Sequence, residues 1–253
     1  MRFALLGSGS RGNGMVVEVG STLLLIDCGL SVTQVKRRMA NLGKLPEELT
    51  AIVVTHEHSD HVSGVTALVR SYDLPIWSTA GTSQAAGLGE LSDCRLFDCH
   101  APFDVADVEV TPFPVPHDAR EPSQFVLSDG HRRLGVLTDV GSLTTHIVAC
   151  LDGCDAMVLE CNHDTAMLAA GDYPPSLKHR VGGRHGHLSN EQAADLLTKM
   201  DTSRMQHIVA AHLSEKNNTP HLARNALSEA LNCEANWIAV ADQDKGLAWR
   251  EVV

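Results

Sequence analysis

The stretch that decides the fold is VVTHEHSDH, residues 53–61, where an apolar run ends directly in three histidines and one aspartate. The two valines and the threonine favour a buried strand. On an extended backbone His56 and His58 project to one side, whereas Asp60 and His61 fall at the turn into the next helix. The stretch predicts a metal site, and one such loop can serve two ions. A merely solvated polar loop would not need this density and spacing of ligands.

Three later polar residues are placed in the same way. His117, Asp139 and His212 each stand at the end of an apolar run. If each run is a strand with one ligand at its end, these side chains lie close to the loop around His56, at one rim of the fold. We therefore expect them to complete the coordination of the metal.

The remaining composition is that of a globular chain. Its 253 residues are 43% hydrophobic, include 14 histidines and carry a formal net charge of −11. This acidic excess disfavours indiscriminate binding of duplex DNA, and three Trp, two Tyr and five Phe are too few for an extended base-stacking platform. No apolar run reaches membrane-spanning length, so no membrane partner is expected. Seven cysteines without a CxxC motif indicate reduced thiols and a cytoplasmic location.

Strand and helix patterns predict an α/β fold in a single domain, residues 1–253, with two sheets packed together and helices outside. Strands are expected at 2–6, 15–19, 22–26, 51–55, 75–78, 108–111, 125–128, 134–138, 156–160, 207–210, 237–241 and 247–252. Helices are expected at 33–41, 62–72, 145–151, 190–200 and 220–231. Residues 171–188 form the longest stretch expected to be irregular, and such loops are commonly functional.

The ligand pattern resembles the metallo-β-lactamase superfamily over most of the chain, from Asp27 to His212. The HxHxDH signature of that superfamily is matched at residues 56–61, and its later histidine, aspartate and histidine are matched at residues 117, 139 and 212. The resemblance implies an αββα four-layer sandwich, in which two mixed β-sheets are flanked by helices.

The resemblance also implies which residues hold metal. The implied ligands are His56, His58 and His117 for one ion, Asp60, His61 and His212 for the other, and Asp139 as the bridge. Asp27, behind the apolar run 23–26, would orient the ligands or the metal-bound water. Two divalent ions about 3.5–4 Å apart can lower the pKa of a bridging water to about 7 and so supply hydroxide for hydrolysis. Nitrogen and oxygen donors favour Zn²⁺, and Mn²⁺ or Fe²⁺ is also admissible.

Five segments narrow the resemblance to the YycJ group, also called WalJ or VicX. They are residues 9–13, 27–31, 159–164, 186–190 and 212–218. That group is regarded as exonuclease-like and as acting 5′ to 3′ on DNA. The resemblance implies a phosphodiesterase that attacks DNA ends with a metal-bridged hydroxide. One departure is Cys161, where serine is more usual in the group.

Several residues outside the ligand set are candidates for catalysis or substrate binding. A hydrolytic phosphodiester step needs a proton donor to the leaving oxygen, and His163 fits that role, with His187 as the alternative. The candidate catalytic residues are therefore Asp27, Asp60 and His163. Candidate substrate-binding residues come from a basic strip, a helix start and the rim: Lys178, Arg180, Arg184, His187, Ser189, Asn190 and Asn162. An ordinary helix cap explains Ser189 and Asn190 equally well.

Other functions remain open from the sequence. A small-molecule hydrolase such as a thioesterase or lactonase would use the same metal site. A metal-stabilised regulatory protein without turnover would be favoured by a missing ligand, and none is missing. A flavo-diiron redox role is disfavoured because that group normally has an acidic residue in place of one HxHxDH histidine and carries a flavodoxin domain. The expected partner is nucleic acid, DNA ends in particular, and no oligomeric state is indicated.

Overall fold

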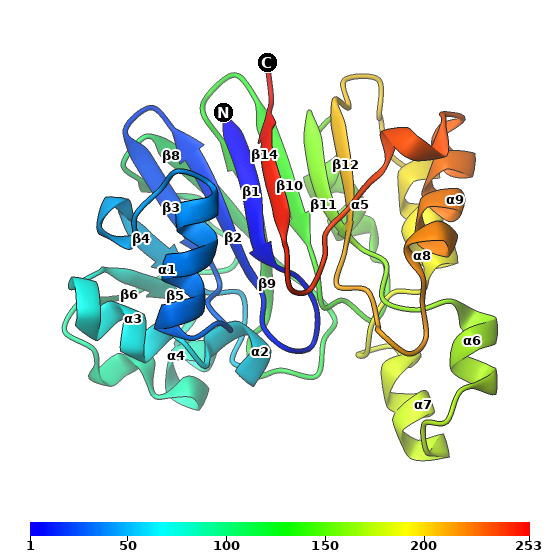
Figure 1. The fold of residues 1–253 in the computed structure, drawn as a ribbon, viewed down its shortest axis with the longest axis horizontal. Coiled ribbons are helices and arrows are strands. Elements are labelled where there is room, and N and C mark those ends of the chain that lie inside the picture. Colours follow the sequence, from blue (N-terminus) through cyan, green and yellow to red (C-terminus); the bar gives the residue numbers. More distant parts are fainter.

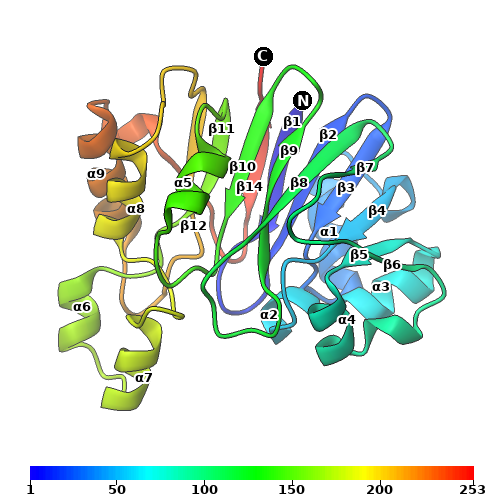
Figure 2. The same ribbon diagram turned by 180° about the vertical axis from the view of Figure 1, so that it is seen from behind.

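The computed structural model describes residues 1–253 and consists of two β-sheets and the helices around them (Figures 1 and 2). The strands of the first sheet are β1 (Arg2–Gly7), β2 (Gly14–Val19), β3 (Thr22–Ile26), β4 (Ala51–Val53), β5 (Ile76–Ser78), β6 (Cys94–Leu96) and β14 (Leu247–Glu251). The strands of the second sheet are β7 (Phe103–Val105), β8 (Val108–Pro114), β9 (Ser123–Ser128), β10 (Arg133–Leu137), β11 (Ala156–Glu160), β12 (His207–Ala211) and β13 (Ala239–Val240).

The helices connect these strands. They are α1 (Val32–Asn41), α2 (Ser59–Val62), α3 (Val65–Tyr72), α4 (Ala80–Ala86), α5 (Thr145–Leu151), α6 (Thr165–Ala170), α7 (Pro175–Val181), α8 (Asn190–Thr198) and α9 (Pro220–Leu231). Short 3₁₀ turns are η1 (Pro46–Glu48), η2 (Leu88–Glu90) and η3 (Ala235–Trp237). None of the helices has both the length and the apolar character that a membrane crossing requires.

Both sheets are mixed and have seven strands. The order is β14-β1-β2-β3-β4-β5-β6 in the first sheet and β13-β12-β11-β10-β9-β8-β7 in the second. Strands β3 to β6 run parallel, as do β10 to β13, whereas the hairpins β1-β2-β3 and β7-β8-β9-β10 are antiparallel. Each parallel half therefore brings several carboxyl ends of strands to the same edge.

Three hydrophobic layers separate the four layers of structure. In β3, Leu24 and Ile26 point into the core between the sheets, while Leu23 and Leu25 point toward α1 and α3. Because successive side chains in a strand alternate between its two faces, a continuous apolar run is what a sheet covered on both sides requires. In β11, Val158 faces the other sheet and Met157 faces α5, α8 and α9. The expected fold class, a four-layer αββα sandwich, is confirmed (Figures 1 and 2).

The structure departs from the sequence-based expectation at several segments. The single helix expected at 62–72 is divided into α2 and α3 at Gly64, where a Cβ would lie 1.9 Å from the carbonyl oxygen of Leu30. The stretch 171–188, expected to be irregular, contains α7. This helix has only seven residues, and its two aliphatic residues, Leu177 and Val181, make too short an apolar stripe to predict a helix. Helices α4 and α6 and strands β6 and β7 were also not expected.

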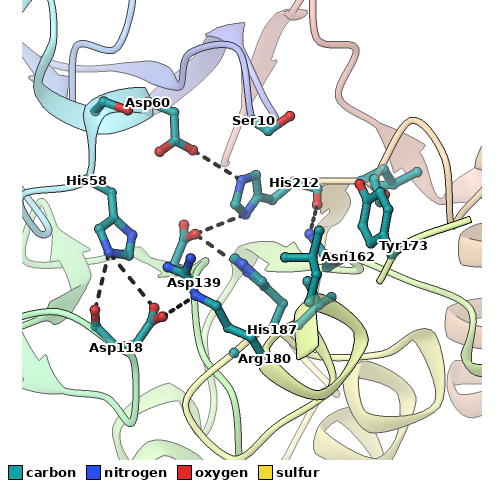
Figure 3. A pocket seen from close by; sticks show the side chains of 16 residues that line it. Ser10, His58, Asp60, Asp118, Asp139, Asn162, Tyr173, Arg180, His187 and His212 are labelled. Atoms are coloured by element: carbon teal, nitrogen blue, oxygen red, sulfur yellow. Dashed lines mark hydrogen bonds and ion pairs between the residues drawn. The ribbon is translucent and has the colours of Figure 1, made fainter. Parts of the chain in front are cut away.

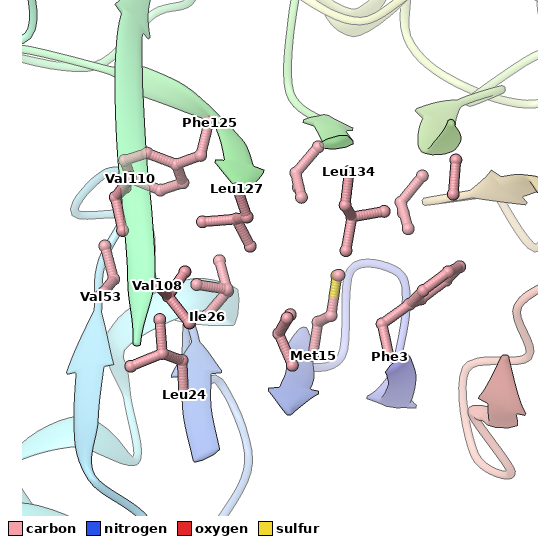
Figure 4. Close-up of a cluster of buried hydrophobic side chains, with 14 of the residues drawn as sticks. Phe3, Met15, Leu24, Ile26, Val53, Val108, Val110, Phe125, Leu127 and Leu134 are labelled. Atoms are coloured by element: carbon pink, nitrogen blue, oxygen red, sulfur yellow. The ribbon is translucent and has the colours of Figure 1, made fainter. Parts of the chain in front are cut away.

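Phe125 tests the core between the sheets. Its ring is fully buried among side chains of both sheets (Figure 4), so we expect Phe125→Ala to lower the free energy of unfolding by about 3–5 kcal/mol. Urea denaturation followed by circular dichroism measures the change. The matched control is Leu96→Ala at an exposed position, which should change stability by less than about 0.5 kcal/mol. Equal losses in the two variants would contradict this assignment of the core.

Candidate metal centre

Three of the predicted site residues follow strands in left-handed backbone conformations. The φ angles are 58° at Asp27, 53° at Asp139 and 54° at His212. A residue with a side chain adopts this region at a cost, and persists there only when its surroundings hold it. The surroundings do so at His212, whose amide donates to Oγ of Ser8 at 2.7 Å and whose carbonyl accepts from Nδ2 of Asn162 at 3.0 Å. These turns bring side chains from separate strand ends to one rim.

The structure brings all seven predicted metal ligands together. Two groups have their donor atoms within 4.8 Å of one another: His56, His58 and His117 in one, and Asp60, His61 and His212 in the other. Asp139 belongs to two further groups of this kind, one with His56 and His61 and one that includes His212. It therefore lies between the two sets, at the position that a bridging carboxylate would need (Figure 3).

Asp27 holds one half of this cluster from behind. Its Oδ2 lies 2.7 Å from Nδ1 of His61, and its two oxygens accept from the amide and the hydroxyl of Thr55, each at 2.8 Å. The Thr55 hydroxyl in turn accepts from Nδ1 of His56 at 3.0 Å. Both histidines thus carry their proton on Nδ1 and leave Nε2 as a donor to a metal. The Nε2 atom of His56 is buried and has no hydrogen-bond partner.

The other three histidines are anchored in the same way, by a hydrogen bond from one ring nitrogen. Each has one ring nitrogen beside an oxygen acceptor outside the ligand set: His117 Nδ1 beside the Gly186 carbonyl (3.0 Å), His58 Nε2 beside the Asp118 carbonyl (3.3 Å) and His212 Nδ1 beside Oε1 of Glu160 (3.1 Å). The remaining nitrogens meet other ligand atoms, as His58 Nδ1 does at 3.2 Å from His117 Nε2. One anchored and one free nitrogen is the arrangement of metal-binding histidines, so the residues fit divalent cations.

The charges of the cluster also favour a cation. Although burial opposes ionisation, the nearby His212 and His61 hold the pKa of Asp139 well below its ordinary value. Burial would lower the pKa of His212, but the Asp139 carboxylate and Asp60 raise it to about 10. Nε2 of His61 and the buried Oδ2 of Asp139 lie only 3.1 Å apart, where two lone pairs need a proton or a metal between them. Metal binding here would therefore release protons.

Glu160 is a candidate that the sequence reasoning missed. This fully buried carboxylate ends β11, and its Oε1 lies 2.8 Å from Nδ1 of His187. Its Oε2 accepts from the amides of Val140 and Leu188. Burial works against ionisation, but His187 and the hydrogen bonds lower the pKa of Glu160 to about 2. The available signal was an acidic residue at the end of a buried strand, as at Asp27.

A cavity of about 350 Å³ opens beside the cluster, and it receives three of the predicted catalytic or substrate-binding side chains besides Asp60 (Figure 3). These are Asn162, Arg180 and His187. Nε of Arg180 donates to Oδ2 of Asp118 at 2.6 Å. Asn162 uses its amide nitrogen to hold the carbonyl of His212, as described above.

Other predicted residues lie outside the cavity lining. They are His163, Lys178, Arg184, Ser189 and Asn190. His163 is buried, and Lys178 donates to the carbonyl of Ala169. Ser189 forms a capping box with Gln192 at the start of α8, and Asn190 exchanges side-chain hydrogen bonds with Asn218. The groups expected at a helix start for phosphate are thus occupied by the protein itself.

A two-sheet sandwich with a histidine and aspartate cluster at one rim defines the class of metal-dependent hydrolases that the resemblance implied. The chain belongs to the beta-lactamase superfamily, because the model of the beta-lactamase superfamily domain matches residues 22–208. The expected family and the expected enzyme class, a metal-dependent hydrolase, are confirmed.

Two relatives and one solved structure illustrate this membership. Exodeoxyribonuclease YycJ of Bacillus anthracis is 37% identical over 237 residues, with 91% of this chain and 89% of that protein covered. Exodeoxyribonuclease WalJ of Streptococcus pneumoniae is 31% identical, with 98% and 92% covered. The metallo-beta-lactamase fold protein YhfI from Bacillus subtilis superimposes with a TM-score of 0.76 at 16% identity, and 99% of each chain is covered. The last likeness concerns the fold alone.

Asp27→Asn tests the support of the cluster. Asparagine has one oxygen where aspartate has two. It can still accept a hydrogen bond from the Thr55 amide, but its other side-chain atom is an NH₂ group that cannot accept from Nδ1 of His61, so His61 loses its anchor. We expect the affinity for Zn²⁺ to fall about 10- to 100-fold, measured by competition with a chromophoric chelator. The matched control is Asp107→Asn, which removes a carboxylate bonded to Ser21 and Thr22 at another turn and should leave Zn²⁺ affinity unchanged. Unchanged affinity in folded Asp27→Asn would contradict the anchoring role.

Proposed function

We propose that this chain is a dinuclear metal-dependent phosphodiesterase that degrades DNA from the 5′ end toward the 3′ end. The observation that carries the proposal is the pair of three-residue donor sets that meet at Asp139. Beside them lies a cavity with a cationic side chain, Arg180, and with His187, a histidine that is not among the seven predicted ligands. The two relatives named as exodeoxyribonucleases, which cover nearly the whole chain, support the choice of DNA as substrate.

Two divalent ions are the proposed cofactors, with Zn²⁺ favoured and Mn²⁺ or Fe²⁺ admissible. The proposed ligands are His56, His58 and His117 for one ion, Asp60, His61 and His212 for the other, and Asp139 shared between them. When bound, such ions would supply a water nucleophile at neutral pH and polarise the phosphate. The role of Asp27, Thr55 and Glu160 is then to accept a hydrogen bond from Nδ1 of His61, His56 and His212, so that Nε2 of each ring is aimed inward at the metal.

His187 is the side chain best placed to protonate the leaving oxygen. It lines the cavity, whereas His163, the first candidate from the sequence, does not. Its Nδ1 is held 2.8 Å from Oε1 of Glu160, which directs Nε2 away from that carboxylate. Burial tends to lower the pKa of His187, but Glu160 raises it above its ordinary value, so the ring keeps a proton to give. We therefore propose His187 as the general acid, positioned by Glu160.

The cavity favours a phosphodiester over an acyl or lactone substrate. Only four of its 16 lining residues are hydrophobic, whereas sites for small organic molecules are lined mainly by apolar groups. Arg180 is exposed at the rim, and the pairing of its Nε with Asp118 leaves both terminal amino groups of the guanidinium for a phosphate. This cation, together with the metal ions when they are bound, would set the local charge that a DNA end meets, although the net charge of the chain is −11.

The central experiment compares metal-reconstituted wild type with His61→Ala on end-labelled single- and double-stranded DNA and RNA. We expect metal-dependent release of nucleotides from DNA by wild type, with loss of at least about 100-fold in the variant. Phosphorothioate linkages at one end or the other establish polarity, and protection by the 5′ block is expected. Turnover of thioesters or lactones that exceeds turnover of bis-p-nitrophenyl phosphate would replace the proposal by a small-molecule hydrolase.

The proton donor is tested with two leaving groups. On DNA we expect His187→Gln to lower kcat by about 10²- to 10⁴-fold, because the departing oxygen is no longer protonated. On bis-p-nitrophenyl phosphate, whose leaving group needs no proton, the loss should be under about tenfold. His163→Gln, which changes a histidine outside the cavity, is the matched control and should lose little on either substrate. Equal losses of His187→Gln on both substrates would indicate a structural role instead.

A further inference from the structure

We propose that Tyr173 forms a stacking site for the nucleobase next to the scissile phosphate. The inference rests on the proposed function and deepens it, because it specifies an unpaired nucleotide, not a base pair, as the species that enters the cavity.

An aromatic side chain forms one end of the cavity. The four hydrophobic residues of its lining are Tyr173, Leu177, Val181 and Leu213. In Figure 3 Tyr173 stands at the end of the drawn pocket away from His58, with His212 between them. A nucleotide has the same division, since its phosphate is charged and its base presents an apolar face. A cavity of about 350 Å³ can receive one nucleotide.

Core packing explains only Leu213, which packs against the core between the second sheet and its helices, whereas the other three belong to none of the hydrophobic clusters. Leu177 and Val181 are one turn apart on α7, so they share a face of that helix, yet no residue of α7 is buried. Tyr173 is itself only half-buried. These half-buried side chains line the cavity, where a ligand can cover the apolar surface that they still expose.

The chain holds Tyr173 in place before any ligand arrives. Pro174 and Pro175 follow it directly, and Pro174 is the residue that precedes the first turn of α7. The residue before a proline is restricted to extended conformations, so the tyrosine backbone has little freedom. A backbone that is already restricted loses less entropy on binding, which increases the net affinity from stacking.

A cation lies over the ring of Tyr173. Nζ of Lys216 lies 5.7 Å from the centroid of Tyr173 and is exposed. The ammonium is attracted to the electron-rich face of the ring. Because the lysine side chain is exposed and flexible, a base can displace it from that face.

The test uses full-length protein and DNA that carries an abasic site at the terminal position from which wild type releases nucleotides. We expect wild type to lose about 5- to 150-fold in kcat/KM when the terminal base is absent. Tyr173→Ala should lose a similar factor on intact DNA and almost nothing further on the abasic substrate. Tyr173→Phe keeps the ring and should resemble wild type. Equal losses by Tyr173→Ala on both substrates, or no loss on either, would overturn the proposal.

A binding measurement separates this inference from the proposed catalysis. Calorimetric titration compares deoxyadenosine 5′-monophosphate with deoxyribose 5-phosphate, which lacks the base, on wild type and on Tyr173→Ala. We expect wild type to prefer the nucleotide and the variant to bind both equally. Without a base-dependent preference in wild type the stacking site is wrong, even if DNA is cleaved. A preference that persists in a protein without nuclease activity would keep the stacking site and reject the proposed reaction.

Discussion

The structure depends on carboxylates that are buried where strands end. Asp27, Asp139 and Glu160 are each less than 5% exposed, and a buried carboxylate is costly unless charged partners and hydrogen bonds surround it. Histidine rings and backbone amides supply these partners. Because the rings come from other strand ends, the carboxylates force separate loops to meet at fixed positions. The left-handed residues at these turns are tolerated because this network holds them.

The two-sheet sandwich provides the rigid base that such a network needs. The apolar side chains of both sheets fill the interior, and the outer helices cover the remaining faces. The seven proposed ligands stand at or beyond strand ends, and none of them belongs to the hydrophobic clusters of the core. This division explains why the fold is shared with proteins of low identity, whereas the chemistry depends on side chains at one rim.

Much of the fold was predictable because its signals are local. The run 22–26 is apolar on both faces, which only a strand covered on both sides explains, and the HxHxDH stretch places its ligands within six residues. Helix α7 was not predictable, since it has only seven residues, none of them buried, and only Leu177 and Val181 form an apolar face. Glu160 was not assigned a role because its partner His187 lies 27 residues further along the chain.

The sequence by itself determined the family, the sandwich and the set of seven candidate ligands, since each depends on a periodic pattern or a short motif. Only the tertiary structure decided which other polar residues share their space. It placed His187 and Arg180 at the cavity, His163 and Asn190 outside it, and Tyr173 at the end of the cavity away from His58. The physical reason is that proton transfer, phosphate contact and stacking depend on distances between residues that are remote in sequence, and only packing sets these distances.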